Sequence, residues 1–336
     1  MSAAKQRDFA LDALKGFAIA CVVLGHALQR NLEGGGSSLP MMALGAFEMP
    51  LFMFLSGTVL AGRVHAPRWR WVLDRAVRLL VPFVAWTAIH YALAGVPTQG
   101  FTPYIDFSGG PLAYLARTFA APAAGLWYLP ALFICSALLA LLYPLRSRPV
   151  VLAVAGWLLL AGALYARGTL GIAGDYGLLR AAEYWLFFAA GFGWAELGHT
   201  LRFERPMRWA WLLLYLPIAP FAFTAAASLG WPGSVLARLA VGLAGVAFSA
   251  ALISLAEKPA RALRLDKLGG LTMGVYCVHM VFLRPGIGEG AVSVLVSWAV
   301  ALLASVAVTL VLKRIPVVRG VLLGEWPRPQ RASARS

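Results

Sequence analysis

Long apolar stretches dominate the chain, and they restrict it to one class of fold. Ten of them reach, or come close to, the roughly 17–25 residues that a helix needs to cross a bilayer. They span residues 9–29, 42–62, 79–95, 126–145, 149–166, 179–198, 209–229, 235–255, 268–284 and 291–312. Because lipid offers backbone groups no hydrogen-bond partner, each stretch is expected to be helical. The sequence therefore predicts an all-α fold, a polytopic membrane helical bundle of about ten transmembrane helices.

The basic residues predict how this bundle is oriented. With ten crossings, 22 of the 29 Lys and Arg residues fall on the side of the N-terminus, 6 fall on the opposite side, and Lys15 lies within the first stretch. Basic residues accumulate in the cytoplasmic loops of membrane proteins. Both termini are therefore expected in the cytoplasm.

Composition and charge exclude several other classes of protein. Hydrophobic residues make up 60% of the 336 residues and charged residues 13%, which excludes a disordered chain and an ordinary soluble enzyme. The net charge of +15 is spread over short clusters between apolar stretches, and no basic recognition helix is present. Membrane lipids are the expected partners of these clusters, and nucleic acid is not. The three cysteines form no metal-ligand motif, so no metal is expected.

Ionisable side chains inside an apolar stretch are costly to bury, and the first stretch contains three of them. Asp12 and Lys15 lie three residues apart on one helix face, which fits either a local ion pair or a binding site. His26 follows Lys15 by eleven residues. That spacing is about 20° past three helical turns, so the two side chains face the same way about 16 Å apart. Taken alone, His26 fits either helix packing or a functional role.

Two more ionisable residues are expected at the depth of His26, in the outer half of the bundle. Glu48 opens the second stretch, and His279 lies about 16 Å into the ninth. A carboxylate at that depth can orient a histidine and raise its basicity. The alternative for Glu48 is a solvated position at the start of a helix. His26, Glu48 and His279 are thus candidate catalytic residues.

Two arginines mark the cytoplasmic entrance of the third stretch. Arg75 and Arg78 are three residues apart, so they share a face and can clamp a phosphate. Ordinary anchoring at the membrane surface is the alternative. Together with Lys15 they form a cationic layer on the cytoplasmic side. This layer suggests a phosphorylated donor that enters from the cytoplasm, with acid–base chemistry deeper in the bundle.

Five short motifs follow one another along residues 7–280. They are Lys15-Gly16 with Gly25-His26, Met49–Gly57, Arg75-Ala76-Val77-Arg78, Trp127–Phe133 and Tyr276–His279. In this order they resemble the acyltransferase-3 family of integral-membrane O-acyltransferases. The opening motif is most similar to the fucose 4-O-acetylase-like subgroup. Glu48 departs from that subgroup, which often has a histidine before Met-Pro-Leu-Phe, and this leaves the role of Glu48 open.

The resemblance implies transfer of an acetyl or other acyl group from cytoplasmic acyl-CoA to a sugar hydroxyl. The acceptor would be an envelope polysaccharide or a lipid-linked glycan precursor, and the location the bacterial cytoplasmic (inner) membrane. The residues expected to bind the CoA phosphates are Lys15, Arg75 and Arg78, with Asp12 beside Lys15. His26 would act as general base or relay the acyl group.

Trp127 and Tyr128 are the candidate acceptor-binding residues. They lie at the predicted outer start of the fourth stretch, where they can stack on a sugar ring or belong to an interfacial aromatic belt. The alternative function is a transporter or flippase of a glycan or lipid-linked intermediate, which the absence of an internal repeat disfavours.

The sequence predicts one transmembrane acyltransferase-3 domain over residues 1–315. Residues 316–336 are expected to form a cytoplasmic, disordered tail. The longest loop, about residues 96–125, is rich in Pro and Gly. Its length fits either a lid over a binding site or a loose connector.

Overall fold

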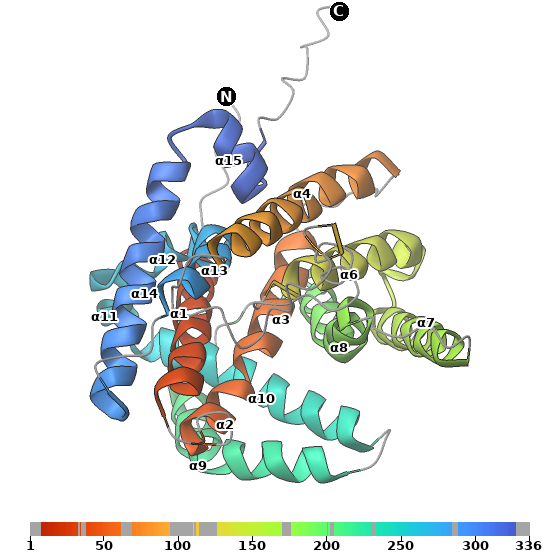
Figure 1. The fold of residues 1–336 in the computed structure, drawn as a ribbon. Coiled ribbons are helices and arrows are strands. Elements are labelled where there is room, and N and C mark those ends of the chain that lie inside the picture. Colours follow the sequence, from red (N-terminus) through yellow and green to blue (C-terminus); the bar gives the residue numbers. More distant parts are fainter. Residues whose placement is uncertain are drawn as a thin grey trace, which may run out of the picture.

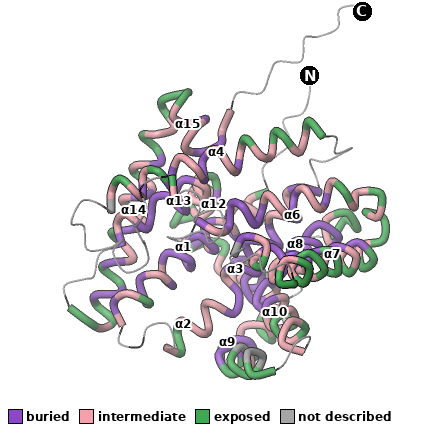
Figure 2. The backbone as a smooth tube through the Cα atoms, turned by 45° about the vertical axis from the view of Figure 1, so that its right-hand side comes forward, coloured by how far each residue is buried: buried purple, intermediate pink, exposed green. Residues whose placement is uncertain are grey.

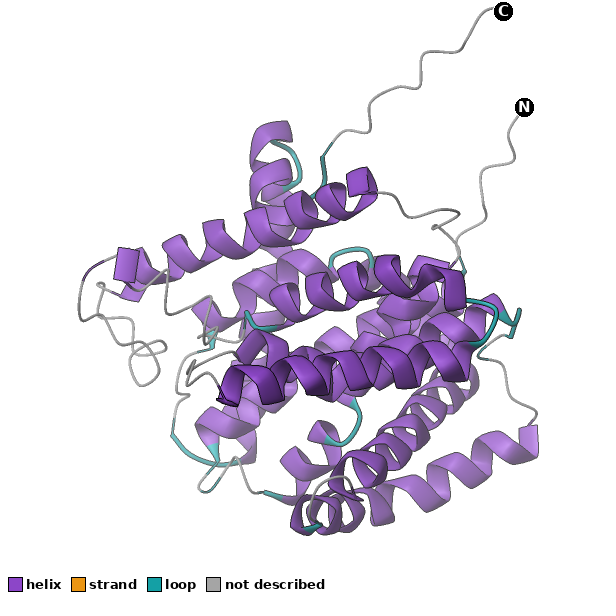
Figure 3. Ribbon diagram, turned by 90° about the vertical axis from the view of Figure 1, so that its right-hand side faces the viewer, coloured by secondary structure: helices purple, strands orange, loops and turns teal. Residues whose placement is uncertain are grey.

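The computed structural model describes residues 8–32, 34, 38–61, 69–94, 110, 112–113, 126–169, 176–199, 201, 205–229, 233–283 and 288–326. All regular structure among these residues is helical (Figure 3). The predicted all-α fold is thereby confirmed. Most of the long loop at residues 96–125 lies outside the described residues.

The helices follow the predicted order. They are α1 (Phe9–Asn31), α2 (Leu39–Gly45), α3 (Glu48–Ala61), α4 (Trp69–Ala94), α6 (Tyr128–Leu142), the 3-10 helix η2 (Tyr143–Leu145), α7 (Pro149–Thr169), α8 (Tyr176–Glu196), α9 (Arg205–Ser228), α10 (Gly233–Leu255), α11 (Glu257–Ala262), α12 (Leu265–Gly269), α13 (Thr272–Phe282), α14 (Ala291–Leu312) and α15 (Pro316–Leu323).

Seven helices in the described part of the chain are long and apolar enough to cross a membrane. They are α1, the α2–α3 pair, α4, α6 with η2, α7, α10 and α14. The other three expected crossings coincide with α8, α9 and the short α13. A polytopic bundle is therefore established, and the number of about ten crossings remains a prediction.

Two helices differ from their expected bounds for identifiable reasons. The second stretch is interrupted at Ala46 and Phe47, and α3 starts at Glu48 with Pro50 in its first turn. Proline is tolerated there because the amide groups of a first turn have no intrahelical partner. Helix α4 starts at Trp69, ten residues before the expected bound. Arg75 and Arg78 therefore lie inside α4 rather than ahead of it.

Helix α1 occupies the middle of the bundle. It packs against α3, α10, α12, α13 and α14, and these helices surround it in Figure 1. Figure 2 shows buried residues concentrated on α1 and α3, whereas α7 and α9 carry long exposed stretches at the periphery. The exposed side chains of α7, α9 and α14 include many large apolar ones, as expected of surfaces that face lipid.

Small residues allow the central helices to approach closely. A Cβ on Gly16 would collide with the carbonyl of Leu265, and one on Gly269 with the carbonyl of Asp12. This explains why glycine follows Lys15 and why α12 lies directly against the start of α1. The buried face of α14 consists of small residues at intervals of four, as is common where membrane helices meet. These residues are Ser293, Ser297, Ala301, Ser305 and Thr309.

The C-terminal segment corrects one expectation. Residues 316–326 were expected to be disordered, but they form α15 and a short extension that packs against α4. Gly324 ends the helix in the left-handed conformation, with φ +64°. The start of α1 and the end of α14 both lie near α12: Asp12 packs against Gly269, and Lys313, just after α14, donates a hydrogen bond to the carbonyl of Gly270, just after α12. Residues 327–336 lie outside the described residues.

Candidate active site

A cavity of about 350 Å³ lies between α1, α3, α4, α6, α13 and α15. It brings together polar side chains from segments far apart in the sequence. The polar side chains in its wall are Lys15, Ser56, Arg75, Arg78, Tyr128, Thr272 and Tyr276. We call it the central cavity. Four of the residues singled out in the sequence, Lys15, Arg75, Arg78 and Tyr128, line it.

One end of the central cavity is basic. Lys15 forms an ion pair with Asp12 at 2.8 Å, and both side chains are about one-fifth exposed, at 19% and 18%. Lys15 also lines the cavity. The two alternatives for this residue, a local ion pair and a position at a binding site, are therefore compatible. Arg78 donates from Nη1 to the carbonyl oxygen of Gly324 at 3.2 Å. We call this region, with Lys15, Arg75 and Arg78, the basic end.

The cavity runs deep into the bundle along α3. Its α3 residues extend from Val59 near the basic end to Met49, next to Glu48. These ten helical positions correspond to about 15 Å. Phe52 and Leu55 add to an apolar wall between them. The central cavity therefore has cationic side chains at one end and a mostly apolar wall along α3.

A cluster of hydroxyl groups interrupts the apolar wall. Ser56 Oγ and the Tyr128 hydroxyl are hydrogen-bonded at 2.6 Å. The backbone N–H of Tyr128 donates to the Tyr276 hydroxyl at 3.1 Å, and the two tyrosine rings meet edge to face with centroids 5.5 Å apart. In the Ser56–Tyr128 pair one hydroxyl proton makes the mutual bond. The other proton can be donated to a ligand in the cavity.

Beyond Tyr276, two histidines lie side by side. The Tyr276 and His279 ring centroids are 6.1 Å apart, and those of His26 and His279 are 5.3 Å apart at 32°. His279 is fully buried, and His26 is half-buried. The structure thus brings together two residues that are 253 positions apart in the sequence, which we call the histidine pair.

Hydrogen bonds define which nitrogen of each ring is available for chemistry. His279 Nδ1 lies 2.7 Å from the carbonyl oxygen of Tyr276 and 3.1 Å from that of Val275. Carbonyl oxygens only accept, so Nδ1 carries the proton and Nε2 keeps a lone pair. This buried Nε2 has no hydrogen-bond partner among the described residues. His26 Nδ1 lies 3.0 Å from Gln29 Oε1, an assignment that also leaves the lone pair on Nε2.

Glu48 lies beside Gly25, the residue before His26. A Cβ on Gly25 would lie 2.9 Å from Glu48 Oε2, so the carboxylate fills the space that this glycine leaves. No hydrogen bond joins Glu48 to His26 among the described residues, and Glu48 Oε2 is buried without a partner there. The ring of His26 makes its hydrogen bond with Gln29, and an orienting role of Glu48 stays a prediction.

Trp127 and Tyr128 occupy different surroundings. The Trp127 ring stacks on Tyr184 with centroids 5.2 Å apart, and the Arg180 guanidinium carbon lies 5.3 Å from its centroid. Trp127 does not line the central cavity. Tyr128 is buried and lines the cavity beside Ser56. It is therefore not part of an interfacial aromatic belt.

Sequence reasoning missed three features of this site. Ser56 carries no charge, Gln29 is an exposed residue in the last turn of α1, and Gly324 lies in the expected tail. No cluster of His, Cys, Asp or Glu suited to hold a metal ion occurs in the described part of the chain. The site consists of cations at one end, hydroxyls in the middle and imidazoles beyond the deep end.

This chain is similar to one protein family and to two known proteins. The acyltransferase-3 profile, described as an acyltransferase domain, matches residues 8–314. The nodulation protein NolL of Sinorhizobium fredii is 38% identical over 111 residues, 32% of this chain and 29% of that protein. NolL of Mesorhizobium japonicum is 32% identical over 92 residues, 26% of this chain and 25% of that protein. The chain thus matches less than a third of the length of either relative. No solved structure matches it.

Proposed function

The chain belongs to the acyltransferase-3 family, and on that premise we propose that this membrane acyltransferase moves an acetyl or other acyl group from acyl-CoA to a sugar hydroxyl. The acceptor is an envelope polysaccharide or a lipid-linked glycan precursor at a bacterial inner membrane. One observation carries the proposal: three cationic side chains line the central cavity, and Tyr276 in the same cavity wall has its ring centroid 6.1 Å from that of His279 in the histidine pair.

The basic end is suited to the phosphates of CoA. Guanidinium groups form charge-assisted, bidentate bonds to phosphate oxygens, and a lysine adds a compact charge. Arg75, Arg78 and Lys15 all line the cavity there. Asp12 holds Lys15 in place through their ion pair. In this proposal the phosphates stay at the mouth, and the rest of the donor enters the cavity.

The cavity interior is suited to the pantetheine arm of CoA. That arm is mostly apolar with two amide groups, and the cavity wall is mostly apolar with one hydroxyl pair, Ser56 and Tyr128. The spare hydroxyl proton of this pair donates to an amide carbonyl of the arm. Tyr128 is thereby assigned to the donor rather than to the sugar. Trp127 has no role in this proposal, because its ring already packs against Tyr184 and Arg180.

The histidine pair supplies the acid–base chemistry. His26 takes the proton of the acceptor hydroxyl, whose oxygen attacks the thioester carbonyl carbon. The carbon–sulfur bond breaks, and the proton passes to the departing sulfur, which leaves as the CoA thiol. While His26 is protonated, the lone pair of His279 Nε2 can accept a hydrogen bond from it and stabilise the charge. Gln29 fixes the orientation of the His26 ring.

The test uses purified full-length protein in lipid nanodiscs with acetyl-CoA labelled in the acetyl group. Release of CoA is followed with and without an envelope-glycan fraction, together with transfer of label to the glycan. We expect glycan-stimulated CoA release and labelled glycan from the wild-type protein. Folded protein that neither binds nor consumes acetyl-CoA would contradict the proposal and favour a transporter.

A further inference from the structure

The segment after α14 forms one wall of the central cavity. Leu323 and Gly324 line it, although they belong to the last residues described. We call residues 316–326 the C-terminal strap. Trp86 of α4 donates from Nε1 to the carbonyl oxygen of Leu322 at 2.9 Å. Arg78, about two turns earlier on α4, donates to the carbonyl oxygen of Gly324, which lies shortly after Leu322. The strap is therefore attached directly to the helix that carries the two cavity arginines.

Helix α15 of the strap ends at Gly324, in a backbone conformation that only glycine adopts easily. Gly324 has φ +64°, and a Cβ there would collide with the carbonyl of Arg78. This close approach places the Gly324 carbonyl oxygen within reach of the Arg78 guanidinium. One of the five N–H donors of Arg78 is used in this bond, and the others remain for a ligand. The strap thus sets where the guanidinium group lies.

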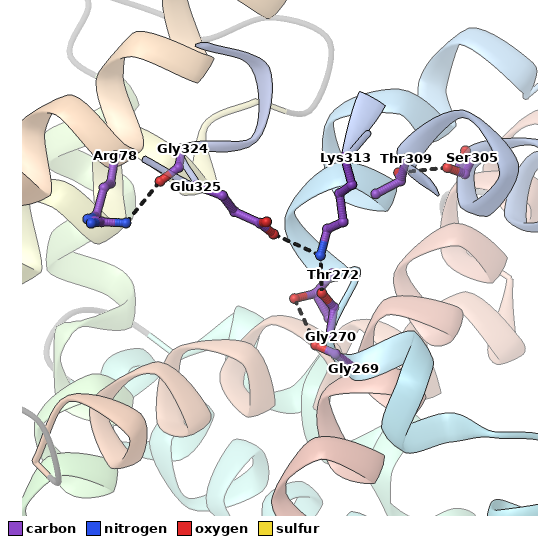
Figure 4. Close-up of polar contacts among 9 residues, drawn as sticks. All are labelled: Arg78, Gly269, Gly270, Thr272, Ser305, Thr309, Lys313, Gly324 and Glu325. Carbon is purple, nitrogen blue, oxygen red and sulfur yellow. Dashed lines mark hydrogen bonds and ion pairs between the residues drawn. The ribbon is translucent and has the colours of Figure 1, made fainter. Parts of the chain in front are cut away.

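A single lysine connects the strap to the opposite side of the cavity. Lys313 Nζ lies 2.8 Å from Glu325 Oε1 and donates to the carbonyl oxygen of Gly270 at 3.0 Å. Gly270 precedes α13, the helix that carries Tyr276 and His279. Figure 4 shows Arg78 pointing to Gly324 and the chain of contacts from Glu325 through Lys313 to Gly270. The strap is therefore fastened at α4 and, through Lys313, at the start of α13.

We propose that the C-terminal strap is a wall of the acyl-donor site, held closed by the Lys313–Glu325 ion pair, and that Lys313, Glu325 and Gly324 are positioning residues for Arg78. This inference rests on the proposed function, because the site it completes is the donor site. Neither Lys313 nor Glu325 lines the cavity, so both act through the strap. They affect how tightly donor binds and leave the chemistry at the histidine pair unchanged.

The test has a readout that does not depend on the donor. Val59→Cys places a thiol in the cavity wall, and its reaction with a water-soluble maleimide reports how often the strap opens. The three native cysteines are buried, so the parent protein gives the background. We expect Glu325→Gln and Lys313→Met each to raise the labelling rate about threefold, as suits a partly exposed ion pair. The variant that combines Glu325→Gln with Lys313→Met should be labelled little faster than Lys313→Met alone. Lys313→Arg should be labelled at the rate of the parent protein.

Donor kinetics provide the second readout in the same proteins. The two single variants should raise KM for acetyl-CoA about threefold with kcat within about twofold. Glu257→Gln is the matched control, because Glu257 pairs with Arg261 at 2.7 Å and lines no part of the cavity. Labelling rates and KM values in Glu325→Gln that equal those in Glu257→Gln would overturn the inference.

The outcomes separate this inference from the proposed function. Acetyl-CoA should slow labelling of Val59→Cys in an otherwise unchanged protein. Faster labelling in the strap variants without any protection by acetyl-CoA would support strap closure and contradict the donor site. Protection by acetyl-CoA with no effect of the strap variants would support the donor site and contradict the strap.

Discussion

The basic end of the central cavity and the histidine pair are built in opposite ways. At the basic end, charged side chains are partly exposed and already engaged, as Lys15 is by Asp12 and Arg78 by Gly324. At the histidine pair, His279 is fully buried and its Nε2 has no partner among the described residues. Groups that exchange one partner for another are suited to binding. A lone pair held in place without a partner is suited to a reaction.

The largest effect is expected at the histidine pair. His26→Gln should lower kcat about 10²–10⁴-fold, because the amide replaces the ring without acting as a base. KM for acetyl-CoA should stay within about twofold, since the binding groups lie at the other end. Steady-state kinetics in nanodiscs measure both constants. A His26→Gln protein with unchanged kcat would contradict the claim that the histidine pair carries out the acid–base chemistry.

Arg78 should show the opposite pattern. Arg78→Gln removes a charge-assisted contact, so KM for acetyl-CoA should rise about tenfold while kcat changes little. Raising the ionic strength should weaken donor binding to the wild-type protein more than to this variant. Arg146→Gln is the control, because Arg146 packs over Tyr143 outside the cavity. Equal KM values in the two variants would contradict the claim that the basic end binds the acyl donor.

Tyr128→Phe tests the middle of the cavity. Loss of the hydroxyl should raise KM for acetyl-CoA about threefold to tenfold, the range for one neutral hydrogen bond. Tyr184→Phe makes the same change in a partly buried tyrosine that packs on Trp127 and does not line the cavity, and it should leave KM unchanged. If Tyr128→Phe instead raised KM for the glycan alone, Tyr128 would belong to the acceptor site, as first predicted from the sequence.

Glu48 should give the smallest effect on catalysis. Glu48→Gln is expected to change kcat less than about twofold, because the His26 ring makes its hydrogen bond with Gln29. The variant should be at least as stable to heat, since it removes the charge of a carboxylate whose buried Oε2 has no hydrogen-bond partner among the described residues. Gln29→Met, by contrast, should lower kcat by about tenfold through loss of one hydrogen bond to the ring. A loss of activity in Glu48→Gln that exceeds the loss in Gln29→Met would restore the orienting role to Glu48.

The sequence was most informative about features that one continuous segment determines by itself, such as a helix or a buried charge. Apolar length predicted the helices and their order, and the cost of burying charge drew attention to Lys15 and His26. It was least informative where packing decides. The extent of α4 was missed because its first turns, from Trp69, are polar enough to resemble a loop. The C-terminal strap was missed because its contacts with α4, a helix more than 200 positions earlier, cannot be seen in its own short segment.

Partners on distant helices could not be predicted for the same reason. Ser56 and Tyr128 are 72 positions apart, and no property of either residue points to the other. The pairing of His26 with His279 depends on α1 and α13 packing side by side. The sequence placed both histidines at a similar depth, and only the fold brings their rings together.

The separation of binding from chemistry is tested most directly by measuring CoA binding and single-turnover acyl transfer in the same proteins. The set is the wild type, His26→Gln, Arg78→Gln and the double variant. Calorimetry should give His26→Gln the wild-type Kd for CoA and Arg78→Gln a Kd about tenfold higher. At saturating acetyl-CoA, Arg78→Gln should transfer the acyl group and His26→Gln should not. Loss of CoA binding in His26→Gln, or unchanged binding in Arg78→Gln, would contradict a cavity that binds at one end and reacts at the other.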